Sequence, residues 1–387
     1  MNGTVEARPR IVLVGAGWYG QKYLDEMTSR DVGGDLAAVV DIAEDLEERY
    51  PVIRKKRIPT YRAISDYVLN PEKDADLAVI SSPIHLHAQM ILECLGQGMN
   101  VLCEKPLCLT EEETLSLSRA ARGAGRFLAV GWQLNYDRAV QALKRDILAG
   151  RFGAPKRARC LHAMRRGNGY YARSSWAGRI SVNGWAVYDS PFMNACAHHF
   201  QLMTWLLGPS MTLPIGVTAA EGELYRGNPG VENYDIAFLR FTAEGGVPIC
   251  YYTAHPLRTK NLGQDALVEF ERATVTWGKG KPFRAVTDTG EEIVYGMDGG
   301  TPLMQKLYDA VQCVKTGEAP ICGPEAGLSH LNAVLMAQRF PVRDIPASRI
   351  EWLEEGGDRF PCVTGLEDAL SACAESWALP KEKGISL

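Results

Sequence analysis

The chain has 387 residues, which is enough for two domains that each bury a core of their own. Hydrophobic residues make up 46% and charged residues 23% of the chain, a composition that excludes a disordered protein. Lysine and arginine (42) nearly balance aspartate and glutamate (46), so the composition gives no sign of the broad basic surface that nucleic acids require.

No apolar run precedes the first strand-like segment at residue 11, and no later stretch reaches the roughly 20 apolar residues that cross a bilayer. We therefore expect a cytoplasmic protein with no membrane partner. The ten cysteines are scattered without Cys-x-x-Cys pairs, which favours reduced and mostly buried thiols over a disulfide scaffold. No metal site is expected.

In the first third of the chain, short apolar strands alternate with helical stretches, and this pattern predicts a parallel sheet covered on both faces. The expected strands lie at 10–14, 36–41, 77–81, 100–103 and 127–130, and the expected helices at 18–30, 43–50, 88–97 and from 110 onward.

After Gly131, longer strand-like runs separated by turn signals predict an α+β domain with an antiparallel sheet. Strands are expected at 156–163, 213–224, 234–242, 247–255 and 266–277, and helices at 138–149, 302–316, 324–339 and 366–377. The predicted domains are therefore 1–131 and 132–387. One possible position for the C-terminal tail, 349–387, is against the first domain.

A glycine-rich loop follows the first predicted strand. Gly15, Gly17 and Gly20 form G-x-G-x-x-G around Trp18 and Tyr19, directly before a predicted helix. The first glycine permits a tight turn, the second lets the backbone approach a pyrophosphate, and the third allows close packing of helix on strand. The pattern predicts a Rossmann domain that binds a dinucleotide.

Asp41 ends the second predicted strand, at the spacing where a carboxylate accepts hydrogen bonds from an adenosine ribose. Its negative charge would repel a 2'-phosphate, so NAD is favoured over NADP. NADP stays open as the second choice, because Arg49 and the basic run at 54–57 could approach the site.

Ser82 and Pro83 follow the strand at 77–81, at the sheet edge where open α/β sheets bind ligands, and we expect them to border the cofactor. His87 lies four residues later. It is either a polar group beside the cofactor or a structural histidine at the start of a helix.

The segment Cys103-Glu104-Lys105-Pro106 closes the strand at 100–103. Here the chain resembles the glucose-fructose oxidoreductase and inositol dehydrogenase family, which also has Pro-x-x-x-His (83–87) and a glycine followed by V-L-x-E-K-P (98–106). The resemblance implies a Rossmann domain followed by a domain with an open antiparallel sheet, which pairs subunits into a homodimer or homotetramer. It also places Lys105 between nicotinamide and substrate, with Glu104 orienting the site. An ammonium there can stabilise an alkoxide as hydride leaves.

The resemblance continues at His198, which fits the family's histidine in the second domain. The family has an aspartate four residues before this histidine and another three residues after it, whereas this chain has Asn194 and Gln201. A carboxylate would make the imidazole a better base. Asp189 is a candidate for supplying it. Two roles therefore stay open: His198 acts as a base with water and Lys105, or Lys105 carries the proton alone.

The loop before His198 contains Tyr170 and Trp176 among amides, a composition that suits a carbohydrate pocket. The pair Arg165-Arg166 indicates an anionic substrate such as a uronate or a nucleotide-linked sugar. A plain solvated loop is the alternative. Asp189, Asn194 and His198 complete the predicted substrate site.

These features predict NAD-dependent oxidation or reduction of a secondary alcohol or ketone of a sugar, inositol or related polyol. The alternative is a non-catalytic regulator that senses a dinucleotide on the same scaffold. Imine reduction or ring opening is a third option. Retention of Lys105 and His198 favours the enzyme.

Overall fold

The computed structural model describes residues 8–70, 74–297 and 299–387. The chain divides into two compact units. The first comprises the chain up to Tyr136 together with Pro302–Glu325, and the second comprises Asp137–Thr301 and Ala326–Leu387.

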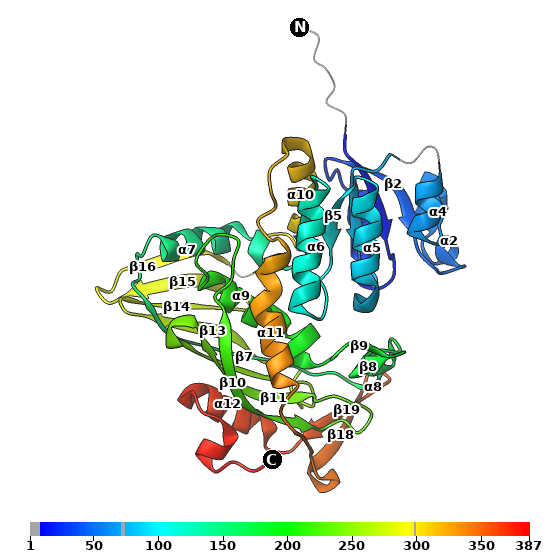
Figure 1. Ribbon diagram of the computed structural model, residues 1–387. Coiled ribbons are helices and arrows are strands. Elements are labelled where there is room, and N and C mark those ends of the chain that lie inside the picture. The colour runs from blue at the N-terminus through cyan, green and yellow to red at the C-terminus, as the bar shows by residue number, and fades with distance from the viewer. Residues whose placement is uncertain (1–7, 71–73, 298) are drawn as a thin grey trace. The chain divides into compact units, whose positions relative to one another are not determined.

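The first unit contains a six-stranded sheet in the order β3-β2-β1-β4-β5-β6, with every pair parallel (Figure 1). The strands are β1 (Arg10–Val14), β2 (Asp35–Val40), β3 (Thr60–Tyr61), β4 (Leu77–Ile80), β5 (Asn100–Cys103) and β6 (Leu128–Val130). The helices are α1 (Tyr19–Ser29), α2 (Leu46–Arg49), α3 (Pro51–Lys56), α4 (Ile64–Leu69), α5 (Ile84–Gly96), α6 (Glu111–Gly123) and α10 (Gln305–Thr316). All residues of β4 and β5 are buried, as helices on both faces require.

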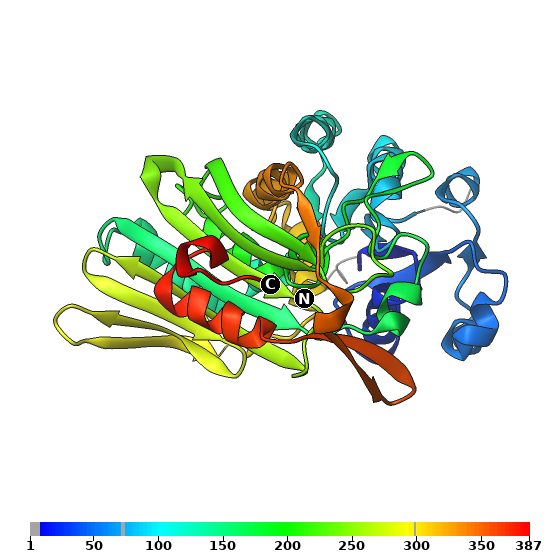
Figure 2. The same cartoon turned by 90° about the horizontal axis from the view of Figure 1, so that it is seen from below.

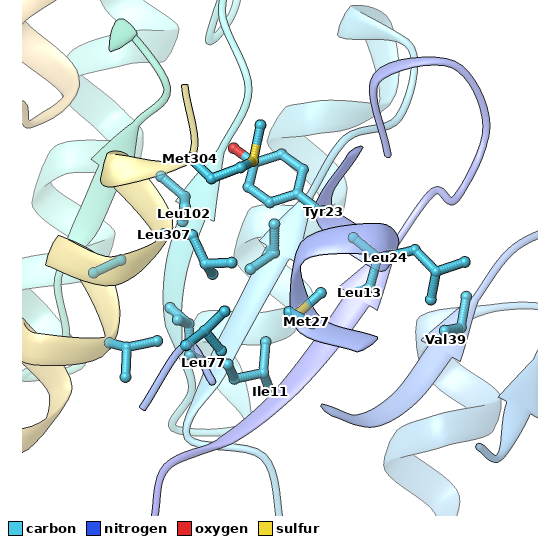
Figure 3. Packing of buried hydrophobic residues seen from close by; sticks show 14 of the residues in the cluster. Ile11, Leu13, Tyr23, Leu24, Met27, Val39, Leu77, Leu102, Met304 and Leu307 are labelled. Atoms are coloured by element: carbon cyan, nitrogen blue, oxygen red, sulfur yellow. The ribbon is translucent and has the colours of Figure 1, made fainter. Parts of the chain in front are cut away.

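One face of this sheet is covered by α1 and α10. Tyr23 and Met27 of α1 belong to the same buried cluster as Leu77 and Leu102 of the sheet and Leu307 of α10 (Figure 3). The boundary predicted at 131 would assign α10 to the second domain. The structure groups α10 with the first unit instead, because its apolar side completes this core.

The second unit contains a nine-stranded sheet in the order β16-β15-β14-β13-β7-β12-β11-β10-β17. Two pairs, β7 with β12 and β10 with β17, are parallel, and the other pairs are antiparallel. The strands are β7 (Pro155–Met164), β10 (Val217–Arg226), β11 (Ile236–Ala243), β12 (Pro248–Ala254), β13 (Asn261–Phe270), β14 (Ala273–Gly278), β15 (Lys281–Thr287), β16 (Glu292–Met297) and β17 (Val342–Asp344). The Rossmann unit and the largely antiparallel second unit confirm the predicted fold class.

Helices cover both faces of this second sheet. On one face α9 (Ala197–Leu206) places Phe200 against the rings of Phe241 and Tyr251. On the other face lies α12 (Leu366–Ser376), drawn in red in Figure 2. Its Leu370 belongs to a buried cluster that includes Phe238. The unit also contains α7 (Arg138–Leu148), α8 (Asn168–Ala172), α11 (Leu328–Ala337) and two short hairpins, β8 (Ser181–Val182) with β9 (Trp185–Ala186) and β18 (Ile350–Glu355) with β19 (Asp358–Val363).

The C-terminal tail is therefore a part of the second unit. Residues 349–387 supply the hairpin β18–β19 and the helix α12, whose side chains complete the core under the nine-stranded sheet. This differs from the position against the first domain that we considered from the sequence. The apolar spacing of α12 explains the outcome, because the helix needs an apolar surface and the sheet provides one.

Two further findings concern the whole described chain. All ten cysteines are free and nine of them are buried, which confirms the prediction of reduced, mostly buried thiols. None of the described helices combines the length and the hydropathy that a bilayer-crossing helix needs.

Candidate functional site

The glycine loop between β1 and α1 has no room for side chains at its ends. Gly15 has a φ of +84°, and a Cβ on it would lie 2.7 Å from the backbone oxygen of Ser81. A Cβ on Gly20 would lie 1.9 Å from the backbone oxygen of Gly15. Both contacts are far too short, so only glycine lets α1 begin so close to the strands.

Gly17, in the middle of the loop, faces open space instead. A Cβ built on it meets no atom within 4 Å, and the neighbouring Trp18 is 71% exposed. The loop leads into the N-terminus of α1, where unpaired amides and the helix dipole attract a phosphate group. The residues present therefore fit the pyrophosphate of a dinucleotide at this point.

Asp41 follows the end of β2, beside the glycine loop. Its two carboxylate oxygens accept hydrogen bonds from the backbone N–H groups of Ala16 (2.8 Å) and Ala43 (2.9 Å). Each oxygen keeps acceptor capacity for a ribose hydroxyl. Arg49, one of the residues that could have favoured NADP, is bound to Asp45 at 2.8 Å. The geometry thus favours NAD.

His87 connects the loops that follow β4 and β5. Its Nε2 lies 2.9 Å from the backbone oxygen of Ser82, and its Nδ1 lies 3.0 Å and 3.1 Å from those of Pro106 and Leu107. Burial lowers the pKa of this imidazole. Because both ring nitrogens face backbone carbonyls, the geometry favours the structural role for His87. The histidine fixes the position of the loop that carries Lys105.

A buried ion pair lies directly beside Lys105. The carboxylate of Glu104 pairs with the ammonium of Lys306, accepts a hydrogen bond from the Tyr23 hydroxyl (2.7 Å), and faces the backbone N–H of Lys105 (3.3 Å). Lys306 also donates to the Tyr19 hydroxyl at 3.2 Å. The Lys306 side chain is 1% exposed, and burial lowers its pKa while Glu104 opposes the shift. Glu104 is therefore held in place and orients the segment of Lys105.

Lys306 was not recognised from the sequence. It stands on α10, 202 positions after Glu104, so its partner is remote along the chain. Its position four residues before Ala310 and five before Val311, both buried, places it on the inner face of the helix. That spacing is the one signal that could have identified it.

In the second unit, Asp189 and Asn194 lie together as a pair. The side-chain amide of Asn194 donates to the Asp189 carboxylate at 3.0 Å, and the backbone N–H of Gly178 donates to the same carboxylate at 2.6 Å. Asp189 is 3% exposed. Asp189 thus supplies a carboxylate in this segment. It fixes the orientation of the Asn194 side-chain amide, four residues before His198.

Arg173 contacts both the predicted substrate residues of the loop, Tyr170 and Trp176, and the carboxylate of Asp189. Its guanidinium carbon lies 3.6 Å from the ring centre of Tyr170 and 4.9 Å from that of Trp176. Its Nη2 lies 3.9 Å from the carboxylate of Asp189. The candidates from the loop and from the turn before α9 therefore form one cluster around Arg173, which the sequence did not single out.

His198 is half-buried in the first turn of α9, and its neighbours have structural roles. His199 accepts a hydrogen bond from the Trp277 indole at 3.1 Å, and burial lowers its pKa to about 4. Gln201 is buried and donates to the backbone oxygen of Ala326 at 3.0 Å. Gln201 thus connects α9 to the segment before α11. These contacts give no sign that Gln201 takes part in proton transfer to or from His198.

Residues 9–132 match the family model described as an oxidoreductase family with an NAD-binding Rossmann fold. Over this segment the chain is similar to the glucose-fructose oxidoreductase and inositol dehydrogenase family. The matched segment contains the glycine loop and Asp41, and the NAD-binding Rossmann fold of the model agrees with the cofactor that these residues predicted.

Curated relatives match about half of the chain. An inositol 2-dehydrogenase of Pseudomonas savastanoi pv. phaseolicola is 28% identical over 199 residues, which are 51% of this chain and 54% of the relative. An inositol 2-dehydrogenase of Mycolicibacterium smegmatis is 31% identical over 155 residues, which are 40% of this chain and 44% of the relative. The chain thus spans about half the length of the curated relatives it matches.

Solved structures share the fold over nearly the whole chain. The WlbA dehydrogenase of Bordetella pertussis, solved with NADH and UDP-GlcNAcA, has a TM-score of 0.69 at 20% identity and covers 92% of this chain and 98% of its own. An aldose-aldose oxidoreductase of Caulobacter crescentus has a TM-score of 0.68 at 19% identity, covering 86% and 97%. At this identity the likeness shows the fold of both units and nothing more.

Gly17 gives a test of the dinucleotide site. In Gly17→Ala the new methyl group meets no protein atom, so we expect little change in the free energy of unfolding. The same methyl group would occupy space that a pyrophosphate needs, and we expect the Kd for NAD to rise at least about tenfold, roughly 1.4 kcal/mol. Calorimetric titration with NAD and urea unfolding measure the two quantities. Gly123→Ala, at the equally open end of α6, is the matched control, and equal NAD affinity in both variants would contradict the assignment.

Lys306 gives a test of the buried pair. Lys306→Met keeps an apolar stem of similar length but leaves the Glu104 carboxylate buried without its counter-charge, which costs on the order of 3–5 kcal/mol of folding stability. The double variant with Glu104→Gln removes both charges, and we expect it to recover much of the loss. Guanidinium unfolding of the wild type, the two single variants and the double variant measures this coupling. Additive losses in the double variant would show that the two side chains do not stabilise each other.

Proposed function

We propose that the protein is an NAD-dependent oxidoreductase that acts on a secondary alcohol or ketone of a sugar, inositol or related polyol. The observation that carries the proposal is the fixed position of Lys105. The residue follows Glu104, whose carboxylate is held by Lys306 and Tyr23, and it stands in a domain of an NAD-binding oxidoreductase family. The inositol 2-dehydrogenases among the relatives support the class of substrate.

The reaction needs one group that accepts a hydride and another that accepts a proton. NAD, when bound, takes the hydride from the carbinol carbon or returns it to the ketone. Lys105 stabilises the alkoxide by its positive charge in the oxidation, and Lys105 and His198 handle the hydroxyl proton.

The pair of Asp189 and Asn194 bears on which residue is the base. Asn194 uses its amide N–H on Asp189, so its carbonyl oxygen is the group directed elsewhere. An amide oxygen can orient an imidazole N–H, but it stabilises an imidazolium less than a carboxylate would. We therefore assign His198 a share of the proton transfer, with Lys105 as the larger contributor.

The regulator alternative receives no support from the structure. A protein that only senses a dinucleotide needs the glycine loop and Asp41, yet it gains nothing from a buried ion pair beside Lys105. The cost of desolvating both charges argues for a role at the site.

Lys105→Ala tests the function directly. Without the ammonium, we expect turnover of polyol or sugar substrates to fall by about 10²–10⁴. NAD affinity should stay within a few-fold, because the pyrophosphate and ribose contacts remain. NADH absorbance with a panel of inositols, sugars and sugar acids measures turnover, and calorimetry measures binding. Lys22→Ala on α1 is the control lysine, and full activity of Lys105→Ala would rule out its role.

We further propose that the protein is a homodimer or homotetramer that associates through the second unit's sheet. Val294 on β16 is 57% exposed and lies on strands that α12 does not reach, which leaves apolar surface for a second copy. Light scattering at micromolar concentration should give at least twice the mass of one chain. A monomer at all concentrations tested would contradict this assembly.

A further inference from the structure

Arg165, Arg166 and Arg173 form a basic group at the end of β7, and they differ in their partners. Arg165 pairs with Glu355 and lies over the Phe360 ring, and Arg173 faces Asp189. Among the described residues, the Arg166 guanidinium donates a hydrogen bond only to the backbone oxygen of Arg165, at 3.3 Å. No carboxylate in the described ranges lies within 4.0 Å of its guanidinium.

Arg166 is partly buried, and for this reason its lack of an acidic partner among the described residues needs an explanation. The side chain is half-buried, and its Nε is shielded from solvent with no hydrogen-bond partner among the described residues. A guanidinium is always charged, and partial burial costs free energy unless an anion or several acceptors face it. Most buried or half-buried cations therefore have an acidic partner, as the two neighbouring arginines do.

The Arg166 guanidinium also faces the predicted substrate residues. Its central carbon lies 4.9 Å from the ring centre of Tyr170, on which Arg173 also stacks. Burial raises the pKa of Tyr170 to about 12, and Asp189 and Cys196 contribute to the rise. The Tyr170 ring thus lies against two guanidinium groups, those of Arg166 and Arg173.

The neighbouring His255 is not a second cation beside Arg166. His255 stacks edge-on with Tyr170, at 5.6 Å between ring centres, and its Nδ1 lies 2.8 Å from the backbone oxygen of Met164. Burial and the charge of Arg166 lower the pKa of His255 to about 3, so the ring is neutral at physiological pH. His255 therefore adds no positive charge beside Tyr170, and Arg166 stays the cation of this group that has no carboxylate partner among the described residues.

We propose that Arg166 binds an oxyanion of the substrate, so that the protein acts on acidic sugars, either sugar acids or nucleotide-linked sugars. This inference rests on the proposed function, since it names the substrate class of the same site. Of the adjacent pair that the sequence indicated, Arg166 is the receptor, and Arg165 is a structural residue that holds the hairpin β18–β19. A guanidinium suits the task because its planar donors match a carboxylate or phosphate.

The test compares binding of acidic and neutral sugars to the full chain with NADH present. The probes are glucuronate against glucose, and UDP-glucose against glucose, so that a carboxylate and a pyrophosphate are tested separately. We expect at least one acidic probe to bind tighter than its neutral counterpart by tenfold or more. In Arg166→Met, which keeps the stem over Tyr170, that preference should fall about 10- to 100-fold, the range for a charge-assisted hydrogen bond.

Two control variants separate the role of the charge from a role in folding. Arg166→Lys keeps a charge without the planar donors and should retain part of the preference. Arg145→Met removes an exposed arginine at the end of α7 and should leave binding unchanged. Equal binding of acidic and neutral probes by the wild type would overturn the proposal, as would an equal loss for both kinds of probe in Arg166→Met. Turnover of these sugars, measured in parallel, decides the proposed function separately, because binding does not depend on hydride transfer.

Discussion

A carboxylate without a neighbouring cation is costly inside a protein, and the arrangement around Lys105 depends on how this chain meets that cost. Glu104 is buried at the carboxyl end of β5, and Lys306 neutralises it from α10. The pair fixes the backbone on which Lys105 stands. It also explains why α10 belongs to the first unit, since without the helix both the apolar cluster of α1 and the carboxylate would lose their partners.

Most elements of the first unit can be predicted from short patterns in the sequence. The apolar strands, the glycine spacing and the acidic residue after β2 each act within a few positions, and the structure has them as expected. Thr110, where the sequence predicted the start of a helix, accepts a hydrogen bond from the backbone N–H of Glu113 and so caps α6. β3 is two residues long and half exposed, and such a short edge strand has no distinct pattern.

The second unit was less predictable because its contacts join distant segments. The run expected as one strand at 266–277 is two strands, β13 and β14, joined by a turn at Glu271-Arg272 without glycine or proline. The parallel pairing of β7 with β12 joins strands that are far apart along the chain. Arg173 and Lys306 were missed for the same reason. An arginine or lysine shows its role only through the groups that surround it, and sequence spacing does not give those groups.

The division of the first unit into two stretches of sequence has a consequence for how the protein is made. A ribosome synthesises eight of the nine strands of the second sheet, all except β17, before it synthesises α10. Until then, the core of the nucleotide-binding unit lacks Leu307 and the other apolar side chains of α10. During that interval the sheet face under α1 exposes apolar side chains that a chaperone would recognise. Cellular quality control would therefore treat the first third of this chain as unfinished until α10 has been translated.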